Sequence, residues 1–266
     1  MNAQAVQQDI QRRLPTGACI TRVHVVEETS STQDLAAALV RSDGPGVMVV
    51  GLRQTSGRGR LGRTWHDGAG LGVAATFAVR RSQFACGDAA IPLAAGLAAC
   101  CTCEAAGASA SFGLRWPNDV VERSAGLKIA GVLIENCGPA ALVGVGLNVA
   151  HSAADWPDSL RATACSLRML GSACDVPAAA GELAAQFCRI AGCTAQEVLE
   201  AWRPRDVLLG TLRTFVHDGC TYRGVVRGLD PLSEIAVETP AGELVRLPAL
   251  TTSMVHEAPV GTGPSA

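Results

Sequence analysis

Residues 53–65 place the strongest limit on the fold, because their pattern fits neither a helix nor a strand. They read RQTSGRGRLGRTW, and no apolar period of 3.6 or 2 runs through them, so we expect a loop. Apolar runs typical of strands stand on either side, at Val47–Leu52 and Gly70–Val79. Glycine lets the backbone turn its N–H groups toward a ligand, and arginine forks match the oxygens of phosphates and carboxylates. The stretch is therefore predicted to be an anion-binding loop between two strands of a folded core.

The same loop is compatible with two plainer interpretations: a solvated flexible segment, or an RNA-binding segment rich in arginine and glycine. RNA-binding tails of that kind are long and repetitive, whereas this stretch is short and directly follows a strand. The formal net charge of −2 and the pI near 6.2 also give no global attraction for nucleic acid or for an anionic membrane. The arginines are expected to act locally, within one site.

The overall composition favours a folded protein without a metal cage or a disulfide framework. With 266 residues, 48% of them hydrophobic, the chain can bury the core of one or two domains. Residues 1–13 are polar and no uninterrupted apolar run reaches membrane length, so we expect a cytoplasmic protein. The 11 cysteines are scattered through apolar segments, and the five histidines show no metal-ligand spacing. We expect free, mostly buried thiols and no metal held by the protein alone.

A cluster of hydroxyl side chains follows the first predicted strand. Thr21–Val26 is strand-like, residues 28–33 read ETSSTQ, and a helical pattern runs over Asp34–Arg41. Hydroxyls at this place can cap the helix by accepting hydrogen bonds from its first amides. Four consecutive hydroxyl residues exceed what a cap needs, so Ser31 and Thr32 are equally compatible with binding a polar ligand head group.

The middle of the chain predicts one helix followed by several strands. A helix is expected near residues 89–107, a strand over 111–116, a Pro-Asn-Asp turn at 117–119, and an apolar hairpin over 127–135 and 141–149. Three glycines of the hairpin leave room for a ligand to lie against the sheet: Gly131, Gly144 and Gly146.

Lys128, near the start of that hairpin, is the only lysine among the 22 lysine and arginine residues. A chain that uses arginine everywhere else is expected to use it wherever positive charge alone is enough. Lysine is a compact cation with three donors, which suits it to a crowded site between several oxygens. Lys128 is therefore predicted to be catalytic, with the chance survival of one lysine as the alternative.

The C-terminal part of the chain changes from helical to strand patterns. Residues 177–205 have helical periodicity. Short alternating strands are expected at 211–216, 222–226 and 234–238. This pattern fits a small β-barrel. We place the larger domain at residues 1–209, the barrel at 210–257 and a disordered tail at 258–266.

Four motifs in this order resemble the signatures of the biotin protein ligases, also called biotin-[acetyl-CoA-carboxylase] ligases. They are GRGRLGRTW at 57–65, RWPND at 115–119, KIAGVLIE at 128–135 and GVGLNV at 144–149. The resemblance covers about residues 21–209 and, more weakly, a C-terminal segment that resembles the family's SH3-like β-barrel. It implies an α+β catalytic domain with a mixed sheet and flanking helices, similar to class II aminoacyl-tRNA synthetases, followed by that barrel.

The resemblance also implies roles for particular residues. The implied biotin-binding residues are Ser31, Thr32, Gln54, Gly57, Arg58, Lys128 and Gly131. The implied ATP-binding residues are Arg58, Arg60, Trp65, Asn118, Asp119 and Asn148. The implied catalytic residues are Lys128, Arg58, Arg60 and Asp119. The three cations would stabilise carboxylate and phosphate oxygens, and Asp119 would orient the incoming amine or accept its proton.

The chemistry implied by the family uses biotin, ATP and Mg²⁺. Biotin would be activated as biotinoyl-5′-AMP and then transferred to a lysine of a biotin carboxyl carrier protein or domain. Only about 20 residues precede the first predicted strand, so we expect the short form without an N-terminal DNA-binding domain, with neither DNA nor membrane as a partner and a homodimer left open. A lipoate or octanoate ligase or transferase of the same fold family is the first alternative, and an RNA-binding protein is the second.

Overall fold

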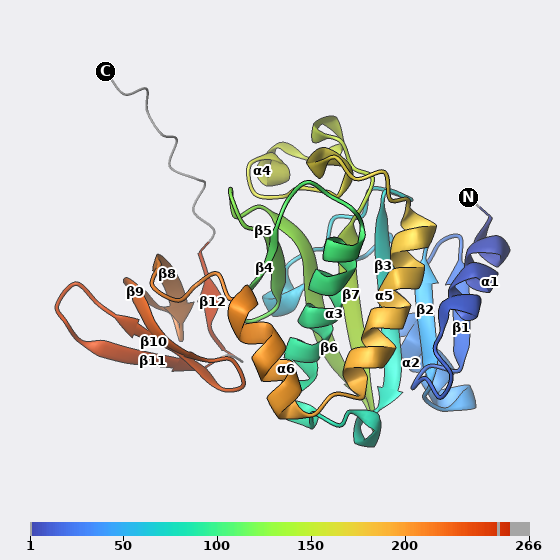
Figure 1. The fold of residues 1–266 in the computed structure, drawn as a ribbon, viewed down its shortest axis with the longest axis horizontal. Coiled ribbons are helices and arrows are strands. Elements are labelled where there is room, and N and C mark those ends of the chain that lie inside the picture. The colour runs from blue at the N-terminus through green and yellow to red at the C-terminus, as the bar shows by residue number, and fades with distance from the viewer. Residues whose placement is uncertain (1, 249–250, 256–266) are drawn as a thin grey trace.

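A seven-stranded mixed sheet forms the centre of the molecule (Figure 1). The computed structural model describes residues 2–248 and 251–255, so the predicted tail at 258–266 lies outside it. The strand order is β1-β2-β3-β7-β6-β5-β4; β1 and β2 are parallel, and all other neighbours are antiparallel. The strands are β1 (Arg22–Val26), β2 (Val47–Gly51), β3 (Gly72–Arg80), β4 (Phe112–Arg115), β5 (Asp119–Glu122), β6 (Lys128–Cys137) and β7 (Ala140–Asn148). The predicted α+β class with a mixed sheet is confirmed.

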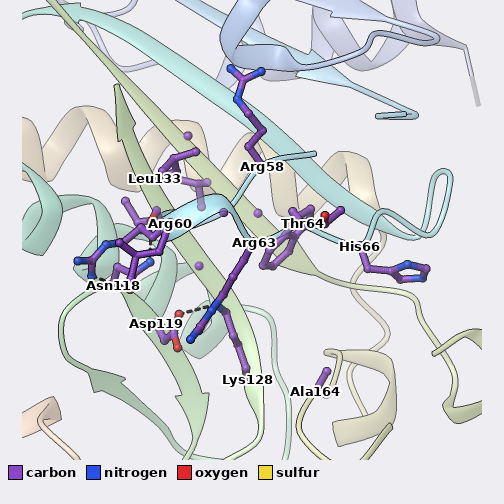
Figure 2. A pocket seen from close by; sticks show the side chains of 18 of the residues that line it. Arg58, Arg60, Arg63, Thr64, His66, Asn118, Asp119, Lys128, Leu133 and Ala164 are labelled. Carbon is purple, nitrogen blue, oxygen red and sulfur yellow. Dashed lines mark hydrogen bonds and ion pairs between the residues drawn. The ribbon is translucent and has the colours of Figure 1, made fainter. Parts of the chain in front are cut away.

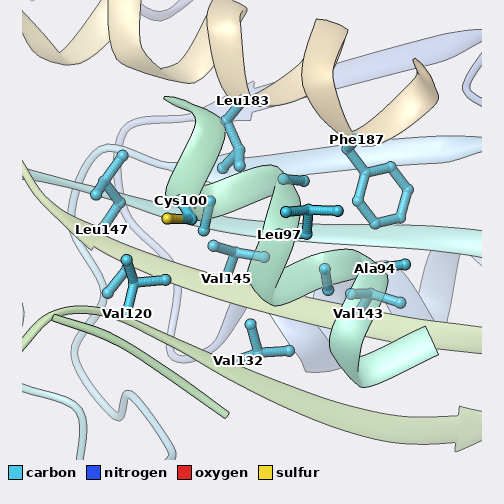
Figure 3. Packing of buried hydrophobic residues seen from close by; sticks show 14 of the residues in the cluster. Ala94, Leu97, Cys100, Val120, Val132, Val143, Val145, Leu147, Leu183 and Phe187 are labelled. Atoms are coloured by element: carbon cyan, nitrogen blue, oxygen red, sulfur yellow. The ribbon is translucent and has the colours of Figure 1, made fainter. Parts of the chain in front are cut away.

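An apolar layer of helices covers one face of this sheet (Figure 3). Helix α3 (Ile91–Ala105) lies against the sheet, and α5 (Val176–Ala191) packs on α3. Every second residue of β7 points into this layer and is buried: Val143, Val145 and Leu147. By length and composition Asp88–Ala105 could cross a membrane, but two thirds of this segment is buried inside the fold, as in a core helix.

The opposite face of the sheet is covered only in part, by α2 (Thr32–Asp43). A small apolar cluster joins this helix to the sheet: Ala36, Val47, Val49, Ala78 and Leu142. Farther along β7 the residues on this face are Gly144 and Gly146, which carry no side chain and so admit the side chains of Gln33 and Trp65 close to the sheet. The sheet therefore has a packed face and a face that is partly left open for a site.

A second, five-stranded antiparallel sheet follows in the C-terminal part, in the order β11-β10-β9-β8-β12. Its strands are β8 (Leu212–His217), β9 (Cys220–Asp230), β10 (Glu234–Glu238), β11 (Leu244–Pro248) and β12 (Ser253–Met254). It agrees with the small barrel-like domain predicted for this segment. The indole Nε1 of Trp116 donates to the carbonyl of Pro231 at 3.2 Å, so the turn between β9 and β10 contacts the RWPND motif.

The sequence patterns missed several short or weakly apolar elements. α1 (Ala3–Arg13) buries only Val6 and Ile10, too few positions to give a clear helical period, and it packs against α5 and β1. The further unpredicted elements are α4 (Asp158–Arg161), β11 and β12; α6 (Ala195–Trp202) continues the predicted helical region. All 11 cysteines are free as expected, although only five are fully buried and Cys220 is exposed.

Candidate active site

A cavity of about 240 Å³ opens on the glycine-bearing face of the large sheet. β3, β6 and β7 form its floor, and the start of α2 forms one wall. The arginine-glycine loop, residues 53–65, forms another wall through residues 58–61 and 63–65. The loop folds back on itself, because the Gly59 N–H donates to the carbonyl of Arg63 at 2.7 Å and the Trp65 N–H donates to that of Gly57 at 2.9 Å. The predicted loop is thus confirmed, and it lies over a cavity.

Hydroxyl and amide groups gather at the α2 end of the cavity. The Ser31 side chain caps α2 by accepting from the Gln33 N–H at 3.3 Å, as the sequence allowed. The backbone N–H and the hydroxyl of Thr32 both donate to Oε1 of Gln54, at 2.9 and 3.2 Å, and Thr76 donates to the Thr32 hydroxyl at 2.8 Å. Three of the predicted biotin-binding residues, Ser31, Thr32 and Gln54, are therefore brought together.

Gln33 adds a buried acceptor without a partner to this polar end. Its Nε2 donates to the carbonyls of Leu133 and Leu142 at 3.1 and 3.5 Å, which fixes the orientation of the amide. Its Oε1 is buried and has no hydrogen-bond partner among the described residues. A Cβ at Gly144 would lie 2.6 Å from Nε2, so only glycine there admits this side chain. A ligand N–H at this end would satisfy an oxygen that is otherwise costly to bury.

Trp65 covers the middle of the cavity floor. A Cβ at Gly146 would come within 2.3 Å of the indole ring, and a Cβ at Gly131 would lie 3.0 Å from Nζ of Lys128 and 3.3 Å from the ring. Gly57 is equally constrained, because a Cβ there would lie 2.7 Å from Gln54 Nε2 and from the carbonyl of Trp65. These glycines thus permit the close approach of the loop, the indole and the sheet.

Lys128 and Asp119 form the charged part of the site. Nζ of Lys128 lies 2.5 Å from Oδ1 of Asp119 and 5.7 Å from the Trp65 ring centroid, and Nη2 of Arg115 donates to Oδ2 of Asp119 at 3.0 Å. The side chains are 28% exposed for Lys128 and 10% exposed for the other two. Burial alone would raise the pKa of Asp119, but Lys128 and Arg115 outweigh it and lower the pKa to about 2.

The backbone of Lys128 is held from several directions. Its N–H donates to the Thr163 carbonyl at 2.8 Å, and its carbonyl accepts from the Cys165 N–H at 2.9 Å. The buried amide Nδ2 of Asn148 donates to the carbonyls of Cys165 and Lys128, at 3.0 and 3.4 Å. Asn148, predicted near the nucleotide, lines the cavity and in the structure contributes to the position of Lys128.

Arg60 and Asn118 also converge on this region. Nη1 of Arg60 donates to Oδ1 of Asn118 at 3.4 Å, and Nδ2 of Asn118 donates to the Val132 carbonyl at 2.8 Å. Burial lowers the pKa of Arg60 from its usual value, and the Asp119 carboxylate opposes that change. Arg63 lines the same cavity. Sequence reasoning omitted Arg63 and Arg115 from the site, although both stand inside the motifs that carried the resemblance.

Arg58 is placed differently from the other cations. Its guanidinium donates to both oxygens of Asp34 at 2.9 Å and to both oxygens of Glu135 at 3.2 Å. Figure 2 shows it pointing away from Asp119 and Lys128, whereas Arg60 lies beside Asn118. The predicted convergence of Arg58 and Lys128 on one anion is therefore not seen in the side-chain arrangement, and an anion-binding role for Arg58 stays a prediction.

Two further walls were not predicted from the sequence. Trp156 lines the cavity and stacks on His151 with ring centroids 4.3 Å apart. Burial lowers the pKa of His151 to about 4, and neither of its ring nitrogens has a hydrogen-bond partner among the described residues. Residues 252–254 of the C-terminal part line the cavity as well. No spacing rule connects these segments to the loop; only the fold brings them together.

Comparison with known proteins identifies the family of this chain. The model of the biotin/lipoate A/B protein ligase family matches residues 25–150. The chain is 31% identical over 246 residues to the biotin--[acetyl-CoA-carboxylase] ligase of Mycobacterium tuberculosis, covering 85% of this chain and 89% of that protein. It is 34% identical over 144 residues to the bifunctional ligase/repressor BirA of Bacillus spizizenii, which covers 52% of this chain but only 43% of the length of that relative.

A solved structure has the same fold. The biotin protein ligase of Aquifex aeolicus, in complex with biotin and ATP, superposes with a TM-score of 0.75 at 23% identity, covering 88% of this chain and 99% of that one. At this identity the likeness concerns the fold alone. Together with the extended match to the Mycobacterium tuberculosis enzyme, the glycine-floored cavity and its single lysine, it leads to one assignment: the chain belongs to the biotin protein ligase family.

Proposed function

We propose that this chain activates biotin with ATP as biotinoyl-5′-AMP and transfers the biotinoyl group to a lysine of a biotin carboxyl carrier protein or domain. The observation that carries the proposal is that one cavity has a neutral polar end and a cationic end. Thr32, Gln33 and Gln54 stand at the first, and Lys128 and Arg60 at the second. Biotin has the matching pattern, with a ureido group at one end and a carboxylate at the other.

The polar end suits a ureido group because it offers both donors and an acceptor. The Ser31 hydroxyl accepts from the Gln33 N–H and can use its own O–H to donate to a ureido oxygen. The orphaned Oε1 of Gln33 can accept from a ureido N–H. On β6, Lys128 and Leu133, which pairs with Gly144, are separated by about 16 Å of extended chain, and the lysine side chain shortens the remaining gap. That span accommodates a bicyclic ring and a valeryl chain lying along the Trp65 indole, which itself covers Gly131 and Gly146.

The first step is an attack of the biotin carboxylate oxygen on the α-phosphorus of ATP. The new oxygen–phosphorus bond gives the mixed anhydride, the bond to the β-phosphate oxygen breaks, and pyrophosphate leaves. Lys128 and Arg60 would lie beside the carboxylate and α-phosphate oxygens and offset the negative charge that develops there. Arg63 would contribute a third cation from the same loop.

The second step is an attack of the carrier ε-amine on the acyl carbonyl. An amide bond forms, the anhydride bond to AMP breaks, and the amine loses a proton. With a pKa of about 2, Asp119 is a weak base, so we assign it to orienting Lys128 and the incoming amine, and we assign the proton to solvent or to the departing phosphate.

Mg²⁺ would bind with ATP and neutralise the leaving phosphate oxygens. Within residues 2–248 and 251–255 no group of three or more His, Cys, Asp or Glu side chains is placed to hold a metal, and Asp119 is engaged by Lys128 and Arg115. The ion is therefore expected on the triphosphate rather than in a protein cage. We also propose that the reaction takes place in the cytoplasm, because it would use ATP and a carboxylase carrier.

The alternatives fit the cavity less well. The dithiolane ring of lipoate or the alkyl chain of octanoate would leave the Gln33 oxygen and the Thr32–Gln54 pair without a ligand partner. An RNA-binding loop would present its arginines to solvent, whereas Arg60 is directed to Asn118 and Arg58 to two carboxylates.

The test is Lys128→Arg, assayed separately for biotinoyl-AMP formation and for transfer to an apo carrier domain. This change keeps the charge but replaces a compact ammonium with a broad fork, so we expect adenylate formation to fall by about 10²–10³-fold. Transfer from supplied biotinoyl-AMP should fall as well. Calorimetry on the wild type provides the control: biotin should bind and lipoate should not. Unchanged adenylate formation in Lys128→Arg, or lipoate binding as tight as biotin, would contradict the proposal.

A further inference from the structure

The Arg58 side chain bridges two separate elements beside the cavity. Nη1 and Nη2 donate to the two oxygens of Asp34 at 2.9 Å, and Nε and Nη2 donate to the two oxygens of Glu135 at 3.2 Å. Four of its five N–H donors are thus used. Asp34 lies in the first turn of α2, two residues after Thr32, and Glu135 lies on β6, the strand that also carries Lys128.

We propose that Arg58 acts as a clamp that holds the arginine-glycine loop over the cavity, and that Asp34 and Glu135 are positioning residues for the ligase reaction. The inference rests on the proposed function and assigns different roles to the arginines of the loop. Arg60 and Arg63 face the reacting groups, whereas Arg58 fixes the loop that carries them.

The backbone of the loop explains how a clamp at Arg58 acts on the other cations. Residues 57–59 pair with residues 63–65 as a narrow hairpin, through the bridge between Arg58 and Thr64. Fixing one strand of this hairpin to α2 and β6 fixes the position from which Arg60 and Arg63 extend. The clamp residue itself need not touch the substrate.

The charges of Arg58 and its two partners favour the same assignment of roles. Arg58 lowers the pKa of Asp34, and Asp34 and Glu135 raise the pKa of Arg58, so the Asp34 carboxylate and the guanidinium are held in their charged forms at neutral pH. If Arg58 turned to a phosphate, four hydrogen bonds would break and two carboxylates would be left unpaired beside an anion-binding cavity. Two unpaired carboxylates would repel the carboxylate and phosphate groups of the substrates. By pairing with them, Arg58 also shields the substrate anions from these carboxylates.

The test compares three variants: the double Asp34→Asn/Glu135→Gln, the single Arg58→Gln and the triple. If Arg58 works through the carboxylates, the double and the single should each raise KM for biotin and ATP about tenfold, with kcat at saturation within threefold of wild type, and the triple should be no worse. If Arg58 is an anion ligand instead, freeing it in the double will leave KM unchanged or lower it, and Arg58→Gln will lose kcat. That second pattern would overturn the clamp.

Trypsin cleavage without substrate gives an independent readout. The double variant keeps Arg58, Arg60 and Arg63, so the sites are unchanged, and cleavage after them should be about tenfold faster than in wild type. Glu104→Gln is the matched control, because it removes a bidentate pair with Arg205 at 2.9 and 3.0 Å outside the cavity and should leave loop cleavage unchanged. Equal loop cleavage in wild type and double variant would refute the clamp. A wild type that forms no biotinoyl-AMP would refute the proposed function instead, and the cleavage result would still stand.

Discussion

Two clusters of cations and carboxylates adjoin the same cavity but differ in their surroundings. In Arg115–Asp119–Lys128 the side chains are 10–28% exposed and come from β4, β5 and β6, so all three rest on the sheet. In Asp34–Arg58–Glu135 they are 35–58% exposed and come from a helix, a loop and a strand. The first is held rigidly where the chemistry is proposed, and the second joins a loop to that framework.

The difference teaches that the same ion-pair chemistry serves two purposes depending on burial. Buried charges cost desolvation energy, so they are kept only where each has its partners, and removing one partner is severe. Half-exposed pairs are screened by water and salt and contribute little energy each, so they can open and close. Rigid charges suit transition-state stabilisation, whereas weakly held ones suit a loop that must admit and release ligands.

The largest expected effect is on the free energy of unfolding of Asp119→Asn. This change leaves Lys128 and Arg115 unpaired at a buried position, and we expect a loss of about 3–5 kcal/mol. Glu135→Gln, the corresponding change in the exposed cluster, should cost about 1 kcal/mol or less. Urea denaturation of both variants measures the two values. Similar losses would break the distinction between the clusters.

A smaller effect is expected in acid. In the folded chain the pKa of Asp119 is about 2, below the ordinary 3.8, so its charged form adds stability above pH 4. That contribution, roughly 2 kcal/mol, is lost as the pH falls from about 4 to 2. The measurement is the difference in unfolding free energy between wild type and Asp119→Asn as a function of pH, which should shrink over this range. A difference that stays constant would mean that Asp119 is not held by its cations.

The fold could be predicted from the sequence where the apolar patterns are strong. Val143, Gly144, Val145 and Gly146 alternate large and absent side chains, and in the structure the valines meet α3 and α5 while the glycines face the cavity. Elements with a weak period were missed, as in α1 with its two buried residues. The β-strand of two residues, Ser253–Met254, is paired only through the fold and left no local signal.

Part of the candidate site could also be inferred from the sequence. Its being the only lysine and its place in an apolar strand singled out Lys128, which lies beside Asp119 in the structure, and the catalytic roles of both residues stay predictions. The sequence could not show in which direction an arginine of a glycine-rich loop points, because that depends on carboxylates 24 and 77 residues away at Asp34 and Glu135. Nor could it place Trp156, whose contact with the cavity depends on the long segment after β7.

The smallest expected effect is a difference in how the two clusters respond to salt. Raising KCl from 0.05 to 0.5 M shortens the screening length from over 10 Å to a few Å, which weakens half-exposed ion pairs more than buried ones. Cleavage of the wild-type loop by trypsin, corrected with a short reference peptide, should therefore quicken about threefold. The Asp34→Asn/Glu135→Gln variant lacks the ion pairs that salt would screen, so its corrected cleavage rate should barely change. The unfolding midpoint of the wild type should also move little, because the Lys128–Asp119 pair is buried. A parallel rise in both proteins would mean that salt loosens the loop by some other route, and the contrast between a rigid and an adjustable cluster would then rest on burial alone.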